Sequence, residues 1–472
     1  MEVSIDLGVV ILYALLILSF GWIGMRRIKN KDDFLVAGRN LGSGFYTGTM
    51  AATVLGGAAT IGSVRLGYLY GISGLWLCAT LGLGIMGLSW LLAKPLLRLR
   101  VYTVTQVLER YYSPATRNAS AVIMLVYALM IGVTSTIATG TILAVIFDLP
   151  FITGIILGGG LVVLYATIGG MWSLTLTDMI QFIIMTVGLV FILLPASVYN
   201  AGGWSAMTQQ LPDAFFSFSN IGYDTILTYF LIYFLGVFIG QDIWQRVFTA
   251  RSEKVAKRAG MLSGLYCILY GIAMAVIGMA ARLVLPELDA PDTAFAAMIN
   301  EVLPVGLRGL VIAASLAALM STASAGLLAA STTVAQDLWP LLRGKHHRDS
   351  DSVTLNRVFT LLFGLLMLAI APTIGDVISA LTMAYNLLVG GMLIPLIGGI
   401  FWKRATTRGA IVSMATGAIT ASVFMLKDGL LANTPIYFSL SIGLITFIVF
   451  SLTDPNPRRT SVVPTPSPVS GE

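Results

Sequence analysis

Charged side chains, cysteine and histidine are all scarce in this sequence, and each shortage excludes a class of protein. Only 11% of the 472 residues are charged, whereas 57% are hydrophobic and the mean hydropathy is +0.88. A soluble globular protein carries about a quarter charged residues and roughly 45–50% apolar ones. So few charged residues cannot cover the water-facing surface of a soluble protein of this length. A soluble fold, a disordered chain and a coiled coil are excluded, and the composition indicates a polytopic membrane protein.

The few cysteines and histidines leave little room for metal or covalent chemistry. Cys78 and Cys267 both lie in apolar runs, which excludes a disulfide framework or a cysteine-based metal site. His346 and His347 are adjacent in a basic loop, so histidine-dependent metal or triad chemistry has no residues to use. The phosphate-binding pattern Gly-x-x-x-x-Gly-Lys-[Ser/Thr] is absent, which excludes ATP-driven transport. We expect no enzyme and no cofactor, and secondary transport, a channel or a membrane sensor remain.

Thirteen apolar stretches have the length, about 20 residues, that a bilayer demands of a helix. No small-residue cleavage site follows the first one, so we expect it to be a retained helix and not a signal peptide. The sequence thus predicts an all-α membrane protein with thirteen transmembrane helices, at 6–25, 43–63, 70–97, 118–146, 151–170, 173–197, 223–242, 259–285, 302–335, 354–373, 376–401, 409–426 and 435–452.

The distribution of lysine and arginine predicts the orientation of these helices. Of the 28 basic residues, 24 fall in alternate loops, which are cytoplasmic if the N-terminus lies outside. We therefore expect a multi-pass protein of the plasma (inner) membrane with an outer N-terminus and a cytoplasmic C-terminus. This bias alone explains the net charge of +6, so no nucleic-acid partner is needed. Residues 454–472, rich in Pro, Ser and Thr, predict a disordered cytoplasmic tail.

Two predicted spans contain glycine and polar residues at their centres. They are the second, around Gly56-Gly57, and the seventh, around Gly236–Trp244. Close packing through glycine would explain either span alone. The two are, however, the first members of two five-helix segments, 43–197 and 223–401, and such a pair indicates an inverted-repeat transporter with its site near the midplane. We expect one transporter domain over 1–453, with an extra N-terminal helix at 6–25 and two C-terminal helices within 409–452.

The ninth span presents a face of small and hydroxyl side chains. Ala318, Ser321, Thr322 and Ala325 share this face by helical spacing. Hydroxyl and carbonyl oxygens are uncharged hard donors that suit an exchangeable Na⁺. The alternative from composition is that these hydroxyls bond their own helix while small residues permit close packing.

Two acids lie at or near membrane depth, Asp178 in the sixth span and Asp242 at the end of the seventh. An ionisable residue inside a span is a functional hypothesis by default. Both lie near the predicted cytoplasmic ends, so solvated interfacial carboxylates are the alternative. For Asp242, a helix-face pair with Arg246, four residues on, is another.

Five stretches, in order along the chain, resemble the sodium/solute symporter family, which includes the sodium/glucose and sodium/proline symporters. They are DFLVAGRNLG (33–42), YATIGGMWS (165–173) with Asp178 and Gln181, QRVFTAR (245–251), AALMST (317–322) and PLIGGIFWKRAT (395–406). The resemblance covers essentially the whole chain. It implies a five-plus-five inverted repeat with two broken helices and one extra helix in front, and Na⁺ as the coupling ion.

The resemblance also implies a sodium site between the second and ninth spans. Its ligands would be the carbonyls of Ala52, Leu55 and Ala318 and the hydroxyls of Ser321 and Thr322. Some relatives hold a second ion with a neighbouring acid and extra serines. Asp178 and Ser324 match that pattern here, whereas Ala325 stands where a further serine would be. A single sodium ion per cycle is therefore the expectation.

The solute is less defined by the sequence. Polar positions of the family's pocket are occupied by Val54, Gly56, Ala58 and Ala59, which disfavours polar readout of a sugar. The tryptophans of a choline-type cage fall on Val54 and Gly240, so a cation–π cage is not supported. The remaining candidates for solute binding are Gly56, Thr60, Gln241, Asp242, Trp244, Tyr385 and Asn386, with Tyr385 either an outer lid or a packed aromatic.

The sequence therefore predicts a sodium-coupled symporter for a small organic solute, an amine or zwitterion, working by alternating access in the bilayer. Asp242 would supply the counter-charge. The alternatives are proton coupling through Asp178, a monocarboxylate substrate, or a sensor that has kept the transporter fold. A sensor would need an appended signalling domain, for which the short tail leaves no room. We expect the small solute and Na⁺ as partners and no obligate protein partner.

Overall fold

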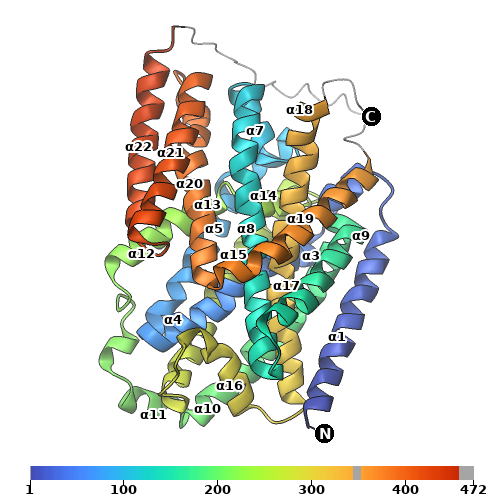
Figure 1. Cartoon of the computed structure of the whole chain (residues 1–472), viewed down its shortest axis with the longest axis vertical. Coiled ribbons are helices and arrows are strands. Elements are labelled where there is room, and N and C mark those ends of the chain that lie inside the picture. Colours follow the sequence, from blue (N-terminus) through green and yellow to red (C-terminus); the bar gives the residue numbers. More distant parts are fainter. Residues whose placement is uncertain (1, 344–351, 456–472) are drawn as a thin grey trace.

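The computed structural model describes residues 2–343 and 352–455, and these residues are almost entirely helical (Figure 1). Within them the only β-type pairing is an isolated bridge between Leu41 and Ala250. The expectations for His346, His347 and most of the tail lie outside the described residues. The predicted all-α class is confirmed.

The first part of the chain, up to the end of the sixth predicted span, contains α1 (Glu2–Met25), α2 (Lys31–Val36), η1 (Ala37–Arg39), α3 (Ser43–Val54), η2 (Ala58–Gly62), α4 (Ser63–Tyr70), η3 (Gly71–Leu75), α5 (Trp76–Leu91), α6 (Ala93–Leu99), α7 (Val104–Tyr111), α8 (Pro114–Phe147), α9 (Phe151–Met185), η4 (Thr186–Leu193) and α10 (Leu194–Asn200).

The second part contains α11 (Gly203–Gln210), η5 (Asp213–Phe216), α12 (Tyr223–Tyr229), η6 (Phe230–Phe234), α13 (Leu235–Val237), α14 (Gln241–Val247), α15 (Glu253–Val284), η7 (Pro291–Thr293), α16 (Ala294–Val302), α17 (Leu307–Thr333), η8 (Val334–Leu338), α18 (Trp339–Arg343), α19 (Val353–Ile374), α20 (Val377–Phe401), α21 (Thr407–Asp428) and α22 (Thr434–Leu452).

The described residues contain ten helices that are long and apolar enough to cross a membrane, or eleven if one bent pair counts as a single span. The predicted count of thirteen is not confirmed. The continuous helical stretches Ala58–Leu91 and Phe151–Asn200 each take in residues that the sequence divided between two spans. The second has 50 residues, about 75 Å of helix at 1.5 Å per residue. It is interrupted at Gly170, whose φ of 47° and ψ of −144° are not helical.

The ends of the described chain lie on opposite faces of the molecule. In Figure 1, α1 begins at the lower end and α22 finishes at the upper end. A chain with this arrangement crosses a bilayer an odd number of times. The most enclosed span is Leu307–Leu342, which contains α17. In its most apolar 18-residue segment 94% of the residues are buried, compared with 22% in the corresponding segments of α1 and α19. The alanines, serines and glycine of α17 allow neighbouring backbones to approach closely.

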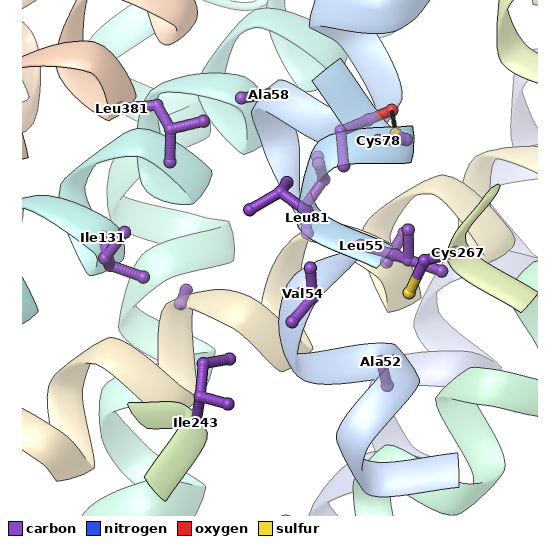
Figure 2. Close-up of a cluster of buried hydrophobic side chains, with 14 of the residues drawn as sticks. Ala52, Val54, Leu55, Ala58, Cys78, Leu81, Ile131, Ile243, Cys267 and Leu381 are labelled. Atoms are coloured by element: carbon purple, nitrogen blue, oxygen red, sulfur yellow. Dashed lines mark hydrogen bonds between the residues drawn. The ribbon is translucent and has the colours of Figure 1, made fainter. Parts of the chain in front are cut away.

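The first interruption lies between α3 and η2, where the sequence has its glycine pair. Leu55 leaves the helical conformation, with φ −86° and ψ 54°. A Cβ atom on Gly56 would lie 2.4 Å from Thr322 Oγ1, and one on Gly57 would lie 2.6 Å from the Cβ of Ala138. Glycine is therefore needed here for close approach to α17 and α8. Figure 2 shows the interruption between Ala52 and Ala58.

The second interruption separates α13 from α14, and the helical segments on either side are bent by 46°. A Cβ atom on Gly236 would lie 2.2 Å from Tyr385 Cδ1, and one on Gly240 would lie 2.7 Å from the hydroxyl of Tyr127. This break therefore packs against α20 and α8. Both interruptions lie inside the segments that the glycines indicated.

A backbone link joins the segments that flank the two broken helices. Leu41, just before α3, donates its N–H to the Thr249 carbonyl at 2.9 Å, and Arg251 donates to the Leu41 carbonyl at 3.1 Å. The segment that precedes the first broken helix is thus hydrogen-bonded to the segment that follows the second.

Candidate sodium and solute site

Hydroxyl groups of α17 meet backbone carbonyls at the end of α3. Ser321 Oγ lies 2.8 Å from the Ala52 oxygen and 2.9 Å from the Ala318 oxygen. Thr322 Oγ1 lies 3.4 Å from the Ala52 oxygen and 2.7 Å from the Thr53 oxygen. The structure therefore brings together four of the five groups expected to bind sodium.

Leu55, the fifth, is placed at the interruption itself. Its N–H still donates to Ala51 at 3.2 Å, but its non-helical ψ turns its carbonyl out of the α3 hydrogen-bonding pattern. The cluster of oxygens is buried and uncharged, which fits a hard monovalent cation. Hydroxyl hydrogens rotate to suit their partners, so the same Ser321 and Thr322 oxygens that donate to carbonyls here can offer lone pairs to a cation.

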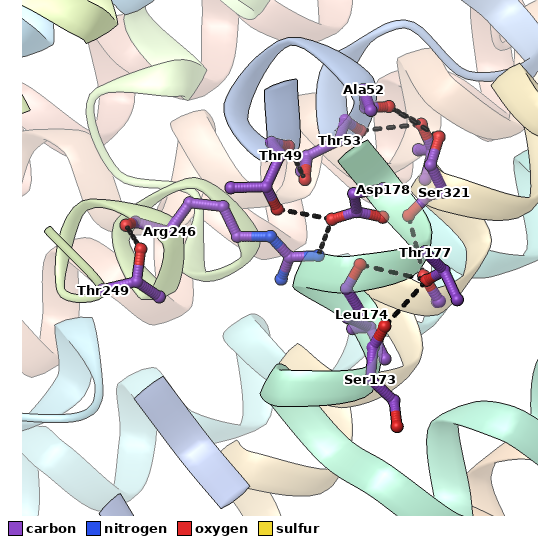
Figure 3. Close-up of polar contacts among 12 residues, drawn as sticks. Thr49, Ala52, Thr53, Ser173, Leu174, Thr177, Asp178, Arg246, Thr249 and Ser321 are labelled. Carbon is purple, nitrogen blue, oxygen red and sulfur yellow. Dashed lines mark hydrogen bonds and ion pairs between the residues drawn. The ribbon is translucent and has the colours of Figure 1, made fainter. Parts of the chain in front are cut away.

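Asp178 of α9 lies beside this cluster and is paired with Arg246 of α14. Its Oδ2 accepts from Thr49 Oγ1 at 2.5 Å and from Arg246 Nη2 at 3.2 Å (Figure 3). The side chains of Asp178 and Arg246 are both 0% exposed. A solvated interfacial carboxylate is therefore wrong for Asp178. The expected alternative pair is also corrected, because Arg246 binds Asp178 and not Asp242.

Ser324, the other candidate for a second ion, donates its hydroxyl to the Ser321 carbonyl at 2.9 Å. No hydrogen bond joins Ser324 to Asp178 among the residues that the structure describes. Asp178 Oδ1 is buried and has no hydrogen-bond partner within the described ranges. Within the described residues there is also no cluster of three or more His, Cys, Asp or Glu side chains that could hold another metal.

A small cavity of about 20 Å³ lies at the first interruption. A space of this size holds about one water molecule. Its lining includes Gly56, Ala58, Asp242, Thr322 and Tyr385, so three of the predicted solute residues meet one of the predicted sodium ligands there. Asp242 is 3% exposed, and its Oδ1 accepts from the Tyr127 hydroxyl at 2.9 Å. An interfacial carboxylate is therefore also wrong for Asp242.

The other solute candidates are engaged elsewhere. Thr60 Oγ1 lies 2.8 Å from the Tyr270 hydroxyl, and Trp244 Nε1 donates to the Phe238 carbonyl at 2.8 Å. Asn386 is 1% exposed, and its amide atoms have no hydrogen-bond partner in the part of the chain that the structure describes. It is not among the residues that line the small cavity. The structure does not bring these three residues to the cavity.

Gln241 fastens the loop before α7. Its Oε1 accepts from the Val104 N–H at 2.9 Å, and its Nε2 donates to the Tyr102 carbonyl at 2.8 Å. The Tyr102 hydroxyl donates in turn to Asp32. Burial, together with the hydrogen bond to Asp32, raises the pKa of Tyr102 to about 12. This hydroxyl therefore stays protonated at neutral pH, and the hydrogen bonds of Tyr102 and Gln241 connect α2, the loop before α7 and α14.

Tyr385 stands between the small cavity and a second, larger one. Its ring lies 5.3 Å from the rings of both Tyr127 and Tyr233 in edge-on contacts. The larger cavity, of about 190 Å³, begins on the far side, where Tyr229 and Thr382 line it. Tyr385 is thus a packed aromatic that lines the small cavity.

Arg65 lines the larger cavity and forms two ion pairs that the sequence did not reveal. Its Nη1 lies 2.9 Å from Asp292 Oδ1 and 3.0 Å from Asp376 Oδ1. These contacts connect α4, η7 and the N-cap of α20. Burial raises the pKa of Asp292, the Arg65 charge opposes that rise, and the neighbouring Asp376 adds to it.

Comparison with known proteins connects this geometry to a family. The sequence profile of the sodium:solute symporter family matches residues 34–417, which is most of the chain. The chain belongs to the sodium:solute symporter family. The predicted resemblance is confirmed, and with it Na⁺ as coupling ion and sodium-coupled transport of a small solute.

Two relatives of this family member are proline transporters. The high-affinity proline transporter PutP of Bacillus subtilis is 27% identical over 430 residues, which cover 86% of this chain and 89% of that protein. The sodium/proline symporter of Staphylococcus aureus (strain JH9) is 26% identical over 464 residues, which cover 93% and 89%.

Solved structures share the fold. A Na⁺-coupled sialic acid symporter in a substrate-bound outward-open state superposes with a TM-score of 0.80 at 20% identity, covering 95% of this chain and 97% of that one. A nucleobase-cation-symport-1 family transporter superposes with a TM-score of 0.57 at 14% identity, covering 89% and 95%. Both are transporters of the same helical architecture.

Proposed function

We propose that this symporter carries a small amine or zwitterionic solute, coupled to one sodium ion, by alternating access. The sodium ligands are the carbonyls of Ala52, Leu55 and Ala318 and the hydroxyls of Ser321 and Thr322. The observation that supports this most directly is the 2.8 Å approach of Ser321 Oγ to the Ala52 oxygen, across two helices 269 residues apart in sequence.

Coupling follows from the shared position of Thr322. Its hydroxyl belongs to the proposed sodium site, and the residue also lines the small cavity. Sodium would fix the broken helix against α17 and so stabilise the outward-open state, in which the cavity can receive solute. Ion binding shifts that equilibrium only by its different affinities for the two states. Solute bound beside Thr322 then allows rocking to the inward state.

The lining of the cavity favours a zwitterion. Asp242 offers a negative charge to an ammonium group. The half-helix that starts at Ala58 begins at the same cavity, and the N-terminus of a helix favours a carboxylate. Proline has both charges and is named as the solute of the two relatives, so it is the first solute to test.

One sodium per cycle is proposed because Arg246 already neutralises Asp178. A second cation at Asp178 and Ser324 would have to compete with a guanidinium 3.2 Å away. We further propose a single transporter domain over 1–453 with repeats 43–197 and 223–401. The N-terminus lies outside and the C-terminus in the cytoplasm, as the basic loops indicate.

The decisive experiment is thermal unfolding of the purified protein in Na⁺ and in K⁺, with proline and a panel of amines, amino acids and monocarboxylates. A ligand stabilises the fold by RT ln(1+[L]/Kd), about 2.7 kcal/mol at 100 times Kd. We expect a proline or amine shift in Na⁺ that is absent in K⁺. Equal shifts in both salts would reject the sodium site and favour proton coupling through Asp178.

The variant D242N tests the counter-charge separately. It should retain the Na⁺ response and lose the solute-dependent shift, because only the ammonium partner is removed. A normal solute shift in D242N would reject Asp242 as the counter-charge while leaving the sodium site standing.

A further inference from the structure

A groove opens between α20 and α22 at the end where α20 finishes. It encloses about 390 Å³ and is lined by apolar side chains, among them Ile394, Ile397, Trp402 and Leu444. The two helices touch at Gly398, where a Cβ atom would lie 2.2 Å from Phe447 Cε1. Absence of a side chain at Gly398 thus brings the helices together on one side and leaves the groove open beside them.

The groove faces away from the protein. Ile397 is 43% exposed and Leu444 is 45% exposed, and the neighbouring Phe401 is 77% exposed. α20 belongs to a membrane-spanning helix, so its exposed apolar side chains meet the hydrocarbon of the bilayer. The surroundings of the groove are therefore lipid acyl chains.

Three basic residues gather at the end of this groove. Lys403 and Arg404 follow α20 directly, and Arg408 lies in the first turn of α21. All three are exposed, and none pairs with an acidic side chain within the described ranges. The Arg408 guanidinium lies 5.3 Å from the ring centroid of Phe450 on α22, which holds this charge on the groove's side of α21.

Trp402 lies where the apolar groove ends and the basic residues begin, and it indicates the depth of this point in the membrane. Its ring lies 5.4 Å from the ring of Phe447 and lines the groove, and the next residue is Lys403. Tryptophan favours the boundary between hydrocarbon and headgroups. The apolar groove thus ends at headgroup level, directly beside uncompensated positive charge.

We propose that this groove is a binding site for an anionic phospholipid, with an acyl chain along Ile394, Ile397 and Leu444 and the phosphate headgroup at Lys403 and Arg404. A groove that accepted any lipid without selection would not need charged residues at its end. Juxtamembrane lysine and arginine attract anionic headgroups, each by roughly fivefold in affinity. The site therefore selects phosphatidylglycerol-type lipids over zwitterionic phosphatidylcholine.

Trp402 provides a direct measurement in the full-length protein. The protein is reconstituted with phosphatidylglycerol brominated on its acyl chains, or with phosphatidylcholine brominated in the same way, each diluted in unbrominated phosphatidylcholine. Bromine quenches a nearby indole, and the difference between the wild type and W402F isolates Trp402 from the other seven tryptophans. We expect half-maximal quenching of Trp402 at a brominated phosphatidylglycerol fraction at least about fivefold lower than for phosphatidylcholine.

The variant K403Q/R404Q should bring the two titrations together, whereas R26Q/R27Q should leave the preference intact. The second variant removes the same charge from two exposed arginines that follow α1, away from the groove. Equal quenching of wild-type Trp402 by the two lipids would overturn the proposal without any charge variant. Loss of the preference in R26Q/R27Q as well would also overturn it, since net charge and not this site would then select the lipid.

Discussion

Arg246 Nη2 lies 3.2 Å from Asp178 Oδ2, and neither side chain is exposed. The two residues come from α14, after the second interruption, and from α9, in the opposite predicted repeat. Removing one partner of a buried ion pair leaves an uncompensated charge, whereas an exposed pair contributes little. The pair is thus a fixed electrostatic connection beside the proposed sodium site.

We predict that D178N and R246Q each destabilise the protein strongly, by about 3–5 kcal/mol. The double variant D178N/R246Q should be less destabilised than the sum of the two single variants, because it leaves no unpaired charge. Thermal unfolding in a constant detergent and salt measures all three. The exposed pair of Arg98 and Glu253 is the matched control, and its variant E253Q should change stability by about 1 kcal/mol or less. Simple additivity of D178N and R246Q would contradict the prediction.

Replacement of a proposed sodium ligand should weaken the response to Na⁺. Loss of an oxygen partner to a charged group costs about 1.5–3 kcal/mol, so S321A should raise the Na⁺ concentration of half-maximal stabilisation roughly tenfold or more. The control is S315A, which removes a hydroxyl of the same helix that donates to the Val311 carbonyl. A Na⁺ titration of the unfolding temperature compares them. Identical titrations for S321A and wild type would exclude Ser321 as a ligand.

Gly56 should tolerate no side chain. In G56A the new methyl group would lie 2.4 Å from Thr322 Oγ1 and 2.7 Å from Ser135 Oγ, so the interruption must move away from α17. Overpacking of this kind costs about 1–3 kcal/mol, and the displaced carbonyls should abolish the Na⁺ response. Gly160 has open space where its Cβ would be, so G160A serves as control. A wild-type Na⁺ titration in G56A would show that the close contact is not needed.

The ion pairs of Arg65 with Asp292 and Asp376 should give the stability a specific pH dependence. An acid whose pKa is raised by folding binds more protons when folded, so the free energy of unfolding falls as pH rises from its ordinary value to the raised one. Asp292 is such an acid. D292N removes this fall, and its stability relative to wild type should therefore be higher at pH 7 than at pH 4.

Thermal unfolding across that pH range measures the difference, with D289N, which alters an exposed acid of the same loop, as control. An unchanged difference between D292N and wild type at all pH values would refute the assignment. The Arg65 contact limits the size of the effect, because it favours the ionised form.

The sequence predicted the features that depend on local chemistry. The helical class and the interruptions at Gly56 and Gly236–Gly240 follow from residue types and spacing along the chain. The family was predicted from the resemblance of five stretches to its motifs. The hydroxyls of Ser321 and Thr322 were recognised because a family motif includes them, and the structure adds their contacts with Ala52.

What the sequence missed depends on contacts between distant segments. Arg246 lies one helical turn from Asp242, but its partner is 68 residues away, and helix packing alone decides between the two. Gln241 and Trp244 were solute candidates because they are polar or aromatic beside a break. The structure uses Gln241 to hold the loop before α7 and lets Trp244 bond its own chain. The sequence divided Ala58–Leu91 and Phe151–Asn200 each between two predicted spans, whereas the structure shows a continuous helical stretch in both places.

The backbone hydrogen bonds between Leu41 and residues 249–251 provide a way to measure how often the molecule opens. Both hydrogen bonds connect the segment before the first broken helix to the segment after the second, so the amide hydrogens of Leu41 and Arg251 are protected only while these segments stay together. In the proposed alternating-access cycle, their exchange with deuterium would count the excursions in which the two segments separate. A ligand that holds the transporter outward would lengthen the interval between those excursions, and one that promotes release would shorten it.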